Sequence, residues 1–492
     1  MRRNPGVFAV VAVALAVAGC ATTMSEIRTG PGTSPSPGEI WTPPPGTRIP
    51  VPTTVPPVAI PPELLAEARN WSLGHLMDLA LRNSPDTRAA WAAARSAAAA
   101  FGSERGAYYP RVEIDASAAR VKGAAAGGTI VFQQTNYGAT LLVDYLLFDL
   151  GGRNASVEEA RLALIAANAH HNAAIQDVAL AVEQTYFQYV EARALLEAEQ
   201  ASAKEARTHL DAAEQRRQAG VATLADVLLA RTALSRAQLG LDTVEGQIQT
   251  IKGALATAVG IPVNTPFDVA APFGDLPLEQ VSSDVDRLIE EAETRRPDLA
   301  AARSLAAKAQ SHIVKVQSEG RPTVDLSGLA GRVWYGSEGV NQDTYSAALL
   351  LRIPVFTGFS QRYKMMEARA DAERSQAQLE SLQQRAVYEV WRSYYALKTA
   401  AARVKTLATM VESATQSEEV ALGRYKAGVG GILEILVAQG ALAAARAQQV
   451  AARSDWFLSL AQLARDTGTL WPPSGKPQAG SPTSDEATRG NP

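Results

Sequence analysis

An internal duplication constrains the fold of this chain more than any other feature. The motif around Pro85 returns around Pro297, an offset of 212 residues (297 − 85). Beyond the first loop region the offset settles at 208 residues (356 − 148) and stays constant, as shown by the pairs Phe148 and Phe356, Tyr186 and Tyr394, Gly220 and Gly428, and Gly260 and Gly468. A repeat of about 200 residues is far longer than a solenoid unit. It indicates a duplicated domain with a pseudo-two-fold relation.

The N-terminus has the pattern of a secretory signal. Arg2 and Arg3 precede an apolar run over residues 7–17, which is too short to cross a bilayer. The run ends at Cys20, the only cysteine of the chain, which therefore cannot form an internal disulfide. The ending resembles a bacterial lipoprotein signal, which implies removal of residues 1–19 and acylation of Cys20, for example with palmitate. An ordinary signal peptide with an incidental cysteine is the alternative. Ala21 after the cysteine favours the outer membrane.

The segments that flank the main body are rich in turn-forming residues. Residues 31–62 are dense in proline, so residues 20–70 are expected to form the lipidated Cys20 and an extended tether. Residues 471–492 are expected to be a disordered tail. The formal net charge is −3, with near-equal numbers of acidic and basic residues, so the composition does not indicate nucleic-acid binding.

Each repeat reads as helix, strand, strand, long helix, turn and return helix. Alternation of period two predicts strands, and apolar residues spaced at 3.5 predict coiled-coil seams in the long helices. The return helices are about half as long as the long ones, and the helix before the strands can supply the missing length. The expected elements of repeat one (71–260) are a helix over 76–106, strands over 111–121 and 137–147, and helices over 153–218 and 223–259. Those of repeat two (287–470) are strands over 323–335 and 345–355 and helices over 359–426 and 432–466.

The strand count predicts an oligomer. Two strands per repeat give four per chain, and an open sheet of four strands cannot lie in lipid because its edges carry unpaired N–H and C=O groups. Single-chain outer-membrane barrels begin at about eight strands. If the strands enter a bilayer, several copies must pool them, and this argument alone allows two copies or three.

The order and doubled spacing of several motifs resemble the TolC-type outer membrane efflux proteins over about residues 71–470. The motifs are Arg296–Leu299, Phe148–Gly152, Phe356–Gly358 and the two Ala-Gly-Val turns. The resemblance implies a mainly α fold with a membrane β-barrel contribution. Four strands per chain would join a shared trimeric 12-stranded barrel, above a long α-helical coiled-coil barrel in the periplasm. Residues 261–286 would form an equatorial segment between the repeats.

The resemblance also implies the partners and the function. We expect a homotrimer in outer membrane lipid, a periplasmic adaptor protein and an inner membrane pump. The lipidated Cys20 resembles the branch that serves resistance-nodulation-division pumps. The expected function is a passive exit duct for small molecules such as drugs and toxic compounds. The alternatives are the duct of a type I protein secretion system and a non-conducting structural coiled-coil lipoprotein. The sequence has no Walker-type, nucleophile-elbow or zincin motif, so we expect no enzyme activity, cofactor or metal.

Two groups of residues are candidates for function. Those at the turns after the long helices resemble the family's periplasmic tips, which contact the adaptor; they are Arg216, Gly220, Val221, Arg424, Gly428 and Val429. As an alternative they are only helix caps with basic last turns. Glu434 matches the family's acidic pore constriction, and Asp226 holds the same place in the first repeat, where it can lie outside the lumen. Val437 stands where a second acidic residue is often found. A first-turn acid favoured by the helix dipole is the alternative for Glu434.

Overall fold

The computed structural model describes residues 60, 70–125, 127, 129–270, 284–336 and 340–470. All of these residues belong to one compact unit. Cys20, nearly all of the expected tether, residues 271–283 of the expected equatorial segment and the C-terminal tail lie outside the described residues. Expectations about those parts therefore remain predictions.

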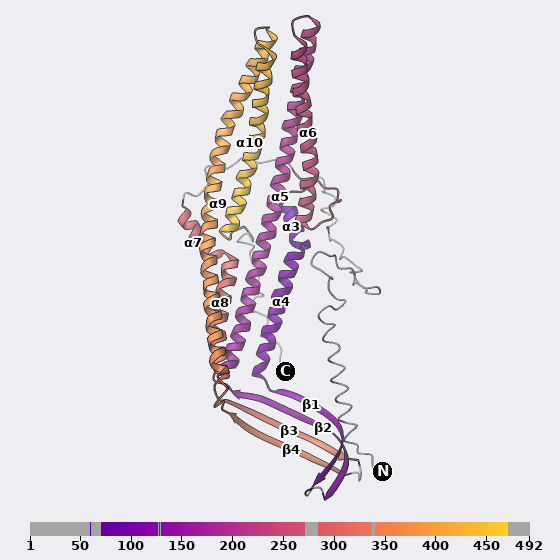
Figure 1. Cartoon of the computed structure of the whole chain (residues 1–492), viewed down its shortest axis with the longest axis vertical. Coiled ribbons are helices and arrows are strands. Elements are labelled where there is room, and N and C mark those ends of the chain that lie inside the picture. The colour runs from indigo at the N-terminus through magenta and orange to yellow at the C-terminus, as the bar shows by residue number, and fades with distance from the viewer. Residues whose placement is uncertain are drawn as a thin grey trace, which may run out of the picture. The chain divides into compact units, whose positions relative to one another are not determined.

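Each repeat contains two shorter helices, two strands, a long helix and a return helix, in that order (Figure 1). The first repeat has α3 (Leu73–Asn83), α4 (Pro85–Arg105), β1 (Arg111–Ala125), β2 (Ile130–Phe148), α5 (Gly152–Gln218) and α6 (Leu224–Val259). The second has α7 (Val285–Arg295), α8 (Pro297–Glu319), β3 (Thr323–Tyr335), β4 (Val340–Arg352), α9 (Ser360–Lys426) and α10 (Ile432–Asp466). The predicted order of elements is confirmed.

The structure corrects the prediction of one helix over 76–106. The segment is two helices that meet at Ser84, whose ψ of 125° is not helical. A residue before proline is pushed out of the helical region, and Pro85 then opens the next helix. The Ser84 hydroxyl caps the new helix by accepting from the backbone N–H groups of Asp86 at 3.2 Å and Thr87 at 3.4 Å.

Several strand boundaries also differ from the prediction, including the start of β4, which lies at Val340 rather than at residue 345. β1 runs on to Ala125 and β2 begins at Ile130, because the hairpin between them is longer than the alternating pattern alone suggested. β4 ends at Arg352, short of the predicted 355. Pro354 lacks the N–H that a further ladder bond would need, which accounts for the earlier end.

The four strands form one antiparallel sheet in the order β1-β2-β3-β4. The two repeats meet between β2 and β3, where Leu142 lies opposite Leu329. β1 and β4 are the edges, so each has one side without a partner strand within the described chain. The sheet lies at one end of the long helices (Figure 1).

The long helices α5 and α9 have 67 residues each. At 1.5 Å per residue each spans about 100 Å. α4 and α6 both pack on α5, and α8 and α10 both pack on α9, so the shorter helices share the length of the long ones as predicted (Figure 1). α8 and α10 also pack on α5, which joins the two repeats along the helices. No helix among the described residues is long and apolar enough to cross a membrane.

Candidate functional site at the hairpin tips

The chain reverses direction at two tips, at the opposite end of the long helices from the sheet (Figure 1). Gly220 follows α5 with φ 75°, and Gly428 follows α9 with φ 78°. The next residue closes each turn, since Val221 N–H donates to the Arg216 carbonyl at 2.9 Å and Val429 N–H donates to the Arg424 carbonyl at 3.0 Å. The backbone needs a left-handed residue at these two places, which is why glycine occupies both.

The side chain of Arg216 connects the first tip to the second. Its Nη1 donates to the Tyr425 carbonyl at 2.6 Å, and its guanidinium lies 4.5 Å from the centre of the Tyr425 ring. Burial raises the pKa of the Tyr425 hydroxyl, so the ring stays neutral beneath the cation. The contact combines a charge-assisted hydrogen bond with a cation–π interaction between the two hairpins.

An apolar cluster lies behind this contact and draws on all four helices of the tips. Its buried residues are Ala206, Leu210, Ala213, Val227, Ala230, Leu234, Ala421, Tyr425, Ile432, Ile435 and Ala438. Val221 and Val429, at the outermost turns, are instead 63% and 68% exposed. The tips are therefore firmly packed inside and present apolar side chains outside.

Asp226 is engaged in capping α6. The Thr223 hydroxyl accepts from the Asp226 N–H at 3.2 Å, and the Asp226 carboxylate accepts from the Thr223 N–H at 2.8 Å. This is a complete capping box, which satisfies two N–H groups at the start of the helix. The pattern Thr223-x-x-Asp226 was readable in the sequence, but the prediction named Asp226 only as the repeat equivalent of the constriction candidate Glu434, either at the constriction or outside the lumen.

Glu434 is the repeat equivalent of Asp226, but its carboxylate has a different kind of partner. The residue equivalent to Thr223 is Gly431, which has no side chain to complete a capping box. Glu434 instead pairs with Arg424 of its own hairpin, with Oε2 3.2 Å from Nε. Both side chains are about half exposed, at 52% for Arg424 and 50% for Glu434. The two repeats thus differ in chemistry at the tips while sharing the same turns.

A buried histidine lies between the hairpins about three helical turns from the tip residue Gly220. His209 on α5 is 2% exposed, and its Nε2 lies 3.3 Å from Oε1 of Glu418 on α9. Burial lowers the pKa of His209, while Glu418 and Glu205 oppose that effect. Nothing in the sequence around this single histidine pointed to it, because its partner is about 200 residues away.

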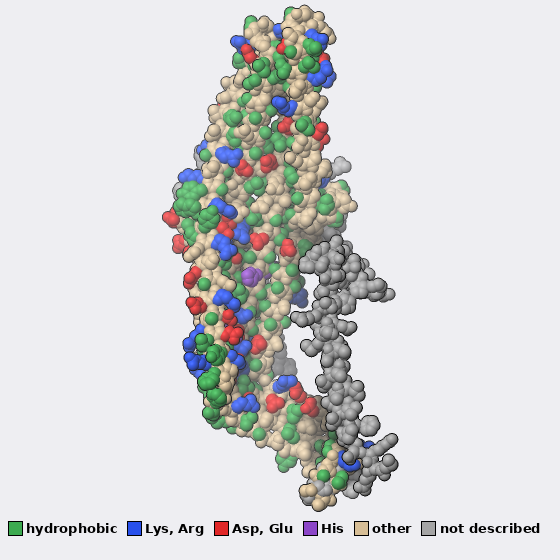
Figure 2. Space-filling model, in the orientation of Figure 1, with side chains coloured by type: hydrophobic (Ala, Val, Ile, Leu, Met, Phe, Trp, Pro, Cys, Tyr) green, Lys and Arg blue, Asp and Glu red, His purple; other side chains and the backbone are tan. Residues whose placement is uncertain are grey.

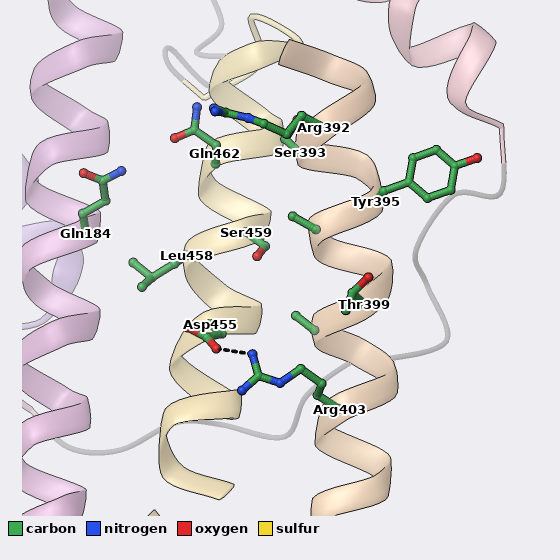
Figure 3. Close-up of a pocket in the computed structure, with 12 residues that line it drawn as sticks. Gln184, Arg392, Ser393, Tyr395, Thr399, Arg403, Asp455, Leu458, Ser459 and Gln462 are labelled. Atoms are coloured by element: carbon green, nitrogen blue, oxygen red, sulfur yellow. Dashed lines mark hydrogen bonds and ion pairs between the residues drawn. The ribbon is translucent and has the colours of Figure 1, made fainter. Parts of the chain in front are cut away.

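An open groove lies between α9 and α10, farther from the tips (Figure 3). It has a volume of about 690 Å³, and Arg403 crosses it to reach Asp455, with Nη1 2.9 Å from Oδ2. Its lining residues come from α9 and α10, with Gln184 from α5, and most of them are polar or charged residue types. Among the described residues no group of three or more His, Cys, Asp or Glu side chains could hold a metal ion. Positive and negative side chains are interspersed over the face seen in Figure 2.

Comparison with known proteins decides the family. Residues 76–261 and 288–469, most of the chain, match the outer membrane efflux protein family. The chain belongs to this family. The efflux protein is 31% identical to Protein CyaE of Bordetella pertussis over 379 residues, which are 76% of this chain and 79% of the relative. It is 25% identical to the pyoverdine export outer membrane protein OpmQ of Pseudomonas putida over 446 residues, 87% and 92% of the two chains.

A solved structure confirms the fold of the efflux protein. The crystal structure of the outer membrane protein VceC from Vibrio cholerae superposes with a TM-score of 0.72 at 23% identity, covering 80% of this chain and 96% of that one. The mainly helical fold with few strands is therefore also the fold of that outer membrane protein. The efflux protein is an outer membrane protein, and its family is one of efflux proteins rather than of enzymes.

Proposed function

We propose that three copies of this efflux protein form one passive exit duct for small molecules across the periplasm and the outer membrane. The observation that carries the proposal is the sheet, whose four strands leave β1 and β4 without partner strands on their outer sides within the described part of the chain. Open edges are costly in lipid, so other copies must cover them. Three copies give twelve strands and room for a lumen. Relatives named for efflux pumps and for pyoverdine export support a small-molecule cargo.

The tips are the proposed contact with a periplasmic adaptor. Val221 and Val429 are exposed at the outermost turns, and Arg216 and Arg424 lie one turn behind them. An apolar pair beside basic side chains suits the turn of an amphipathic helical hairpin. The chain has no motif for coupling to ATP or to an ion gradient, so an inner membrane pump, of the resistance-nodulation-division type, would supply the driving force. We infer that the chain itself catalyses no reaction.

The proposed constriction is Glu434. In a trimer this residue would contribute three carboxylates around one axis, and such a ring favours cations. Its pairing with Arg424 supports a gate that is held within each hairpin and is released when that ion pair breaks. Asp226 is held in its capping box, which supports a role in helix stability rather than in the constriction.

Acylation of Cys20 is the proposed anchor. Several acyl chains on one residue give stable attachment, whereas a single chain gives marginal attachment. Metabolic labelling with an alkyne analogue of palmitate tests this directly. The wild-type chain should be labelled, and the Cys20→Ser variant should not be labelled. A labelled variant or an unlabelled wild type would contradict the proposed lipid anchor but would not bear on the proposed duct.

The duct is tested by recording currents from the purified protein in planar bilayers and by drug accumulation in a strain that lacks its own exit duct. We expect discrete single-channel currents and restored efflux. A protein that assembles but conducts nothing would favour the structural coiled-coil alternative. Export of a polypeptide without small-molecule efflux would favour the type I secretion duct.

A further inference from the structure

We propose that Arg120 and Lys122, at the outer end of β1, bind the phosphate groups of a phosphorylated glycolipid headgroup in the outer leaflet. This site rests on the proposed duct, which places the sheet in the outer membrane. The hairpins β1–β2 and β3–β4 turn at the end of the sheet that lies away from the helices (Figure 1). With the helices in the periplasm, these turns face the outer leaflet.

One face of the sheet is apolar over most of its length and is the face that suits lipid. Residues directly opposite each other in paired strands share a face. The residues of this face are Val112, Ile114, Ala116 and Ala118 of β1, Tyr137, Ala139, Leu141 and Val143 of β2, Leu326, Gly328 and Ala330 of β3, and Tyr345, Ala347 and Leu349 of β4. The other face carries Asp115, Asp144 and Asp325, which suit water in a lumen.

The apolar pattern of this face ends at a similar level in all four strands. The next residues outward on the same face are Arg120 and Lys122 of β1, Thr135 and Gln133 of β2, Arg332 and Trp334 of β3, and Asp343 and Asn341 of β4. Near this level the rings of Tyr137 and Trp334 stack with centroids 5.9 Å apart, and such aromatic side chains concentrate at membrane interfaces. This level is therefore that of the lipid headgroups.

The length of the strands agrees with this level. Val112 and Arg120 are eight residues apart (120 − 112), which is about 26 Å of strand. A strand tilted by about 40° then rises about 20 Å, close to the height of the apolar band of a membrane barrel.

The internal repeat provides a comparison for Arg120. First strands repeat at an offset of 212 residues (332 − 120) and second strands at 208 (343 − 135), so Arg120 is equivalent to Arg332 and Thr135 to Asp343. Arg332 lies opposite Asp343, and its Nη2 donates to Oδ2 at 3.0 Å. Arg120 lies opposite Thr135, which has no charge. An arginine that is neutralised in the second repeat is therefore left uncompensated in the first.

Lys122 adds a second positive charge beside Arg120. It lies opposite Gln133, and both cations are exposed on the same face of one strand. With the Gln133 amide turned to suit its neighbours, its oxygen accepts from Arg120 Nε at 2.9 Å, so this partner is neutral. Within the described residues of β1 and β2, every acidic side chain lies on the opposite face.

Uncompensated cations beside lipid select an anionic headgroup. A charged side chain that faces lipid is costly unless it reaches the interface and finds a partner. Arginine binds phosphate through two parallel hydrogen bonds and lysine adds a point charge, and residues two apart in a strand are only about 7 Å apart. The neighbouring Gln133 amide and Thr135 hydroxyl suit sugar hydroxyls. Cations beside an amide and a hydroxyl therefore fit a phosphorylated sugar better than a simple phospholipid.

Lipid retention by the whole chain, purified in mild detergent, tests the site. Native mass spectrometry measures bound lipid after incubation with bisphosphorylated lipid A, its dephosphorylated form or phosphatidylglycerol. We expect lipid A to be retained at least fivefold more than either of the others. Arg120→Gln combined with Lys122→Gln should lower lipid A retention at least fivefold. Lipid A retained no better than phosphatidylglycerol would overturn the glycolipid assignment, and equal retention by wild type and double variant would overturn the site.

Two further variants use the difference between the repeats. Thr135→Asp rebuilds the ion pair of the second repeat in the first and should lower lipid A retention at least threefold. Arg332→Gln is the matched control, because Asp343 already neutralises this arginine, and should retain lipid A as wild type does. An equal loss in Arg332→Gln and in the double variant would overturn the specific role of the first repeat.

Single-channel currents separate this site from the proposed duct. The Arg120→Gln and Lys122→Gln double variant should conduct as wild type does, because the changed side chains face lipid and not the lumen. A wild-type protein that retains lipid A but conducts nothing would refute the duct alone. A conducting protein whose double variant retains lipid A as well as wild type would refute the lipid site alone.

Discussion

Arg216 and Tyr425 hold the two hairpin tips together, although they lie 209 residues apart in the chain. The link joins the Arg216 cation both to a carbonyl and to an aromatic ring. The equivalent residue of the second repeat, Arg424, pairs with Glu434 of its own hairpin, and no such bridge from it is seen among the described residues. Within the described part of the chain, this bridge of cation, carbonyl and ring is therefore made from the first hairpin only, in addition to the apolar cluster behind the turns.

Removing this link should loosen the tips. Arg216→Ala loses a charge-assisted hydrogen bond and a cation–π contact, together roughly 1–2 kcal/mol at a partly exposed site. We expect a more frequently open channel, measured as higher open probability in planar bilayers. Arg217→Ala is the matched control, since the neighbouring arginine is exposed. An Arg216 variant that gates like wild type would show that the link has no part in closure.

Substitution of the two acidic tip residues should affect different properties, namely stability for Asp226 and ion selectivity for Glu434. Asp226→Asn weakens a capping box and should cost about 1 kcal/mol of stability with little change in currents. Glu434→Gln breaks only a half-exposed ion pair, worth about 0–1 kcal/mol, but should lower the preference for cations. Thermal unfolding and reversal potentials in a salt gradient measure the two effects. Unchanged selectivity in Glu434→Gln would remove this residue from the constriction.

Lowering the pH should reduce the stability of the folded protein through protonation of His209. Burial lowers its folded pKa below the ordinary 6.5, so the unfolded chain binds the proton more readily. The stabilisation is complete above pH 6.5 and is lost as the pH falls from there toward the folded value. The charged groups around the ring are Glu418, Glu205 and Lys426, and Glu205 is itself paired with Arg446.

In the His209→Gln variant, the free energy of unfolding should therefore fall less as the pH is lowered below 6.5. Denaturant unfolding between pH 5 and 7.5 measures it. His171→Gln, in the same helix, serves as control. Equal slopes in wild type and His209→Gln would mean that another group governs the acid response.

Arg296 should be among the most sensitive residues of the fold. It is 3% exposed and bonds Asp298 at 2.7 Å and Glu389 at 2.8 Å. Arg296→Met leaves Asp298 without its ion pair and leaves Glu389 with only its longer contact to Arg465, at 3.6 Å. Breaking a buried ion pair typically costs about 3–5 kcal/mol. The loss should appear as a lower unfolding midpoint and a smaller yield of folded protein. Arg295→Met, next to it and exposed, should behave as wild type, and similar losses in both variants would exclude a specific role for this network.

The parts of the fold that depend on local pattern were predictable. Spacing of 3.5 and the absence of proline predicted α5 and α9 within a residue or two, and the glycines predicted both turns. The break at Ser84 was missed because alanine-rich helical pattern continues on both sides of it. The bridge from Arg216 to Tyr425 and the contact between His209 and Glu418 could not be found, because each depends on how two hairpins pack. The role of Glu434 in the constriction stays a prediction, and its ion pair with Arg424, beside a helix start where Gly431 offers no side chain for a capping box, was not foreseen.

The equal length of α5 and α9 restricts how such a chain can change over time. Seven residues inserted into one long helix would advance its tip by about 10 Å relative to the other. The bridge from Arg216 would then point past Tyr425, and the cluster behind both turns would lose its register. The helical part of this protein can therefore be lengthened only by insertions of equal length in both hairpins, which involve four helices. The two repeats, which began as copies, must therefore keep long helices of equal length.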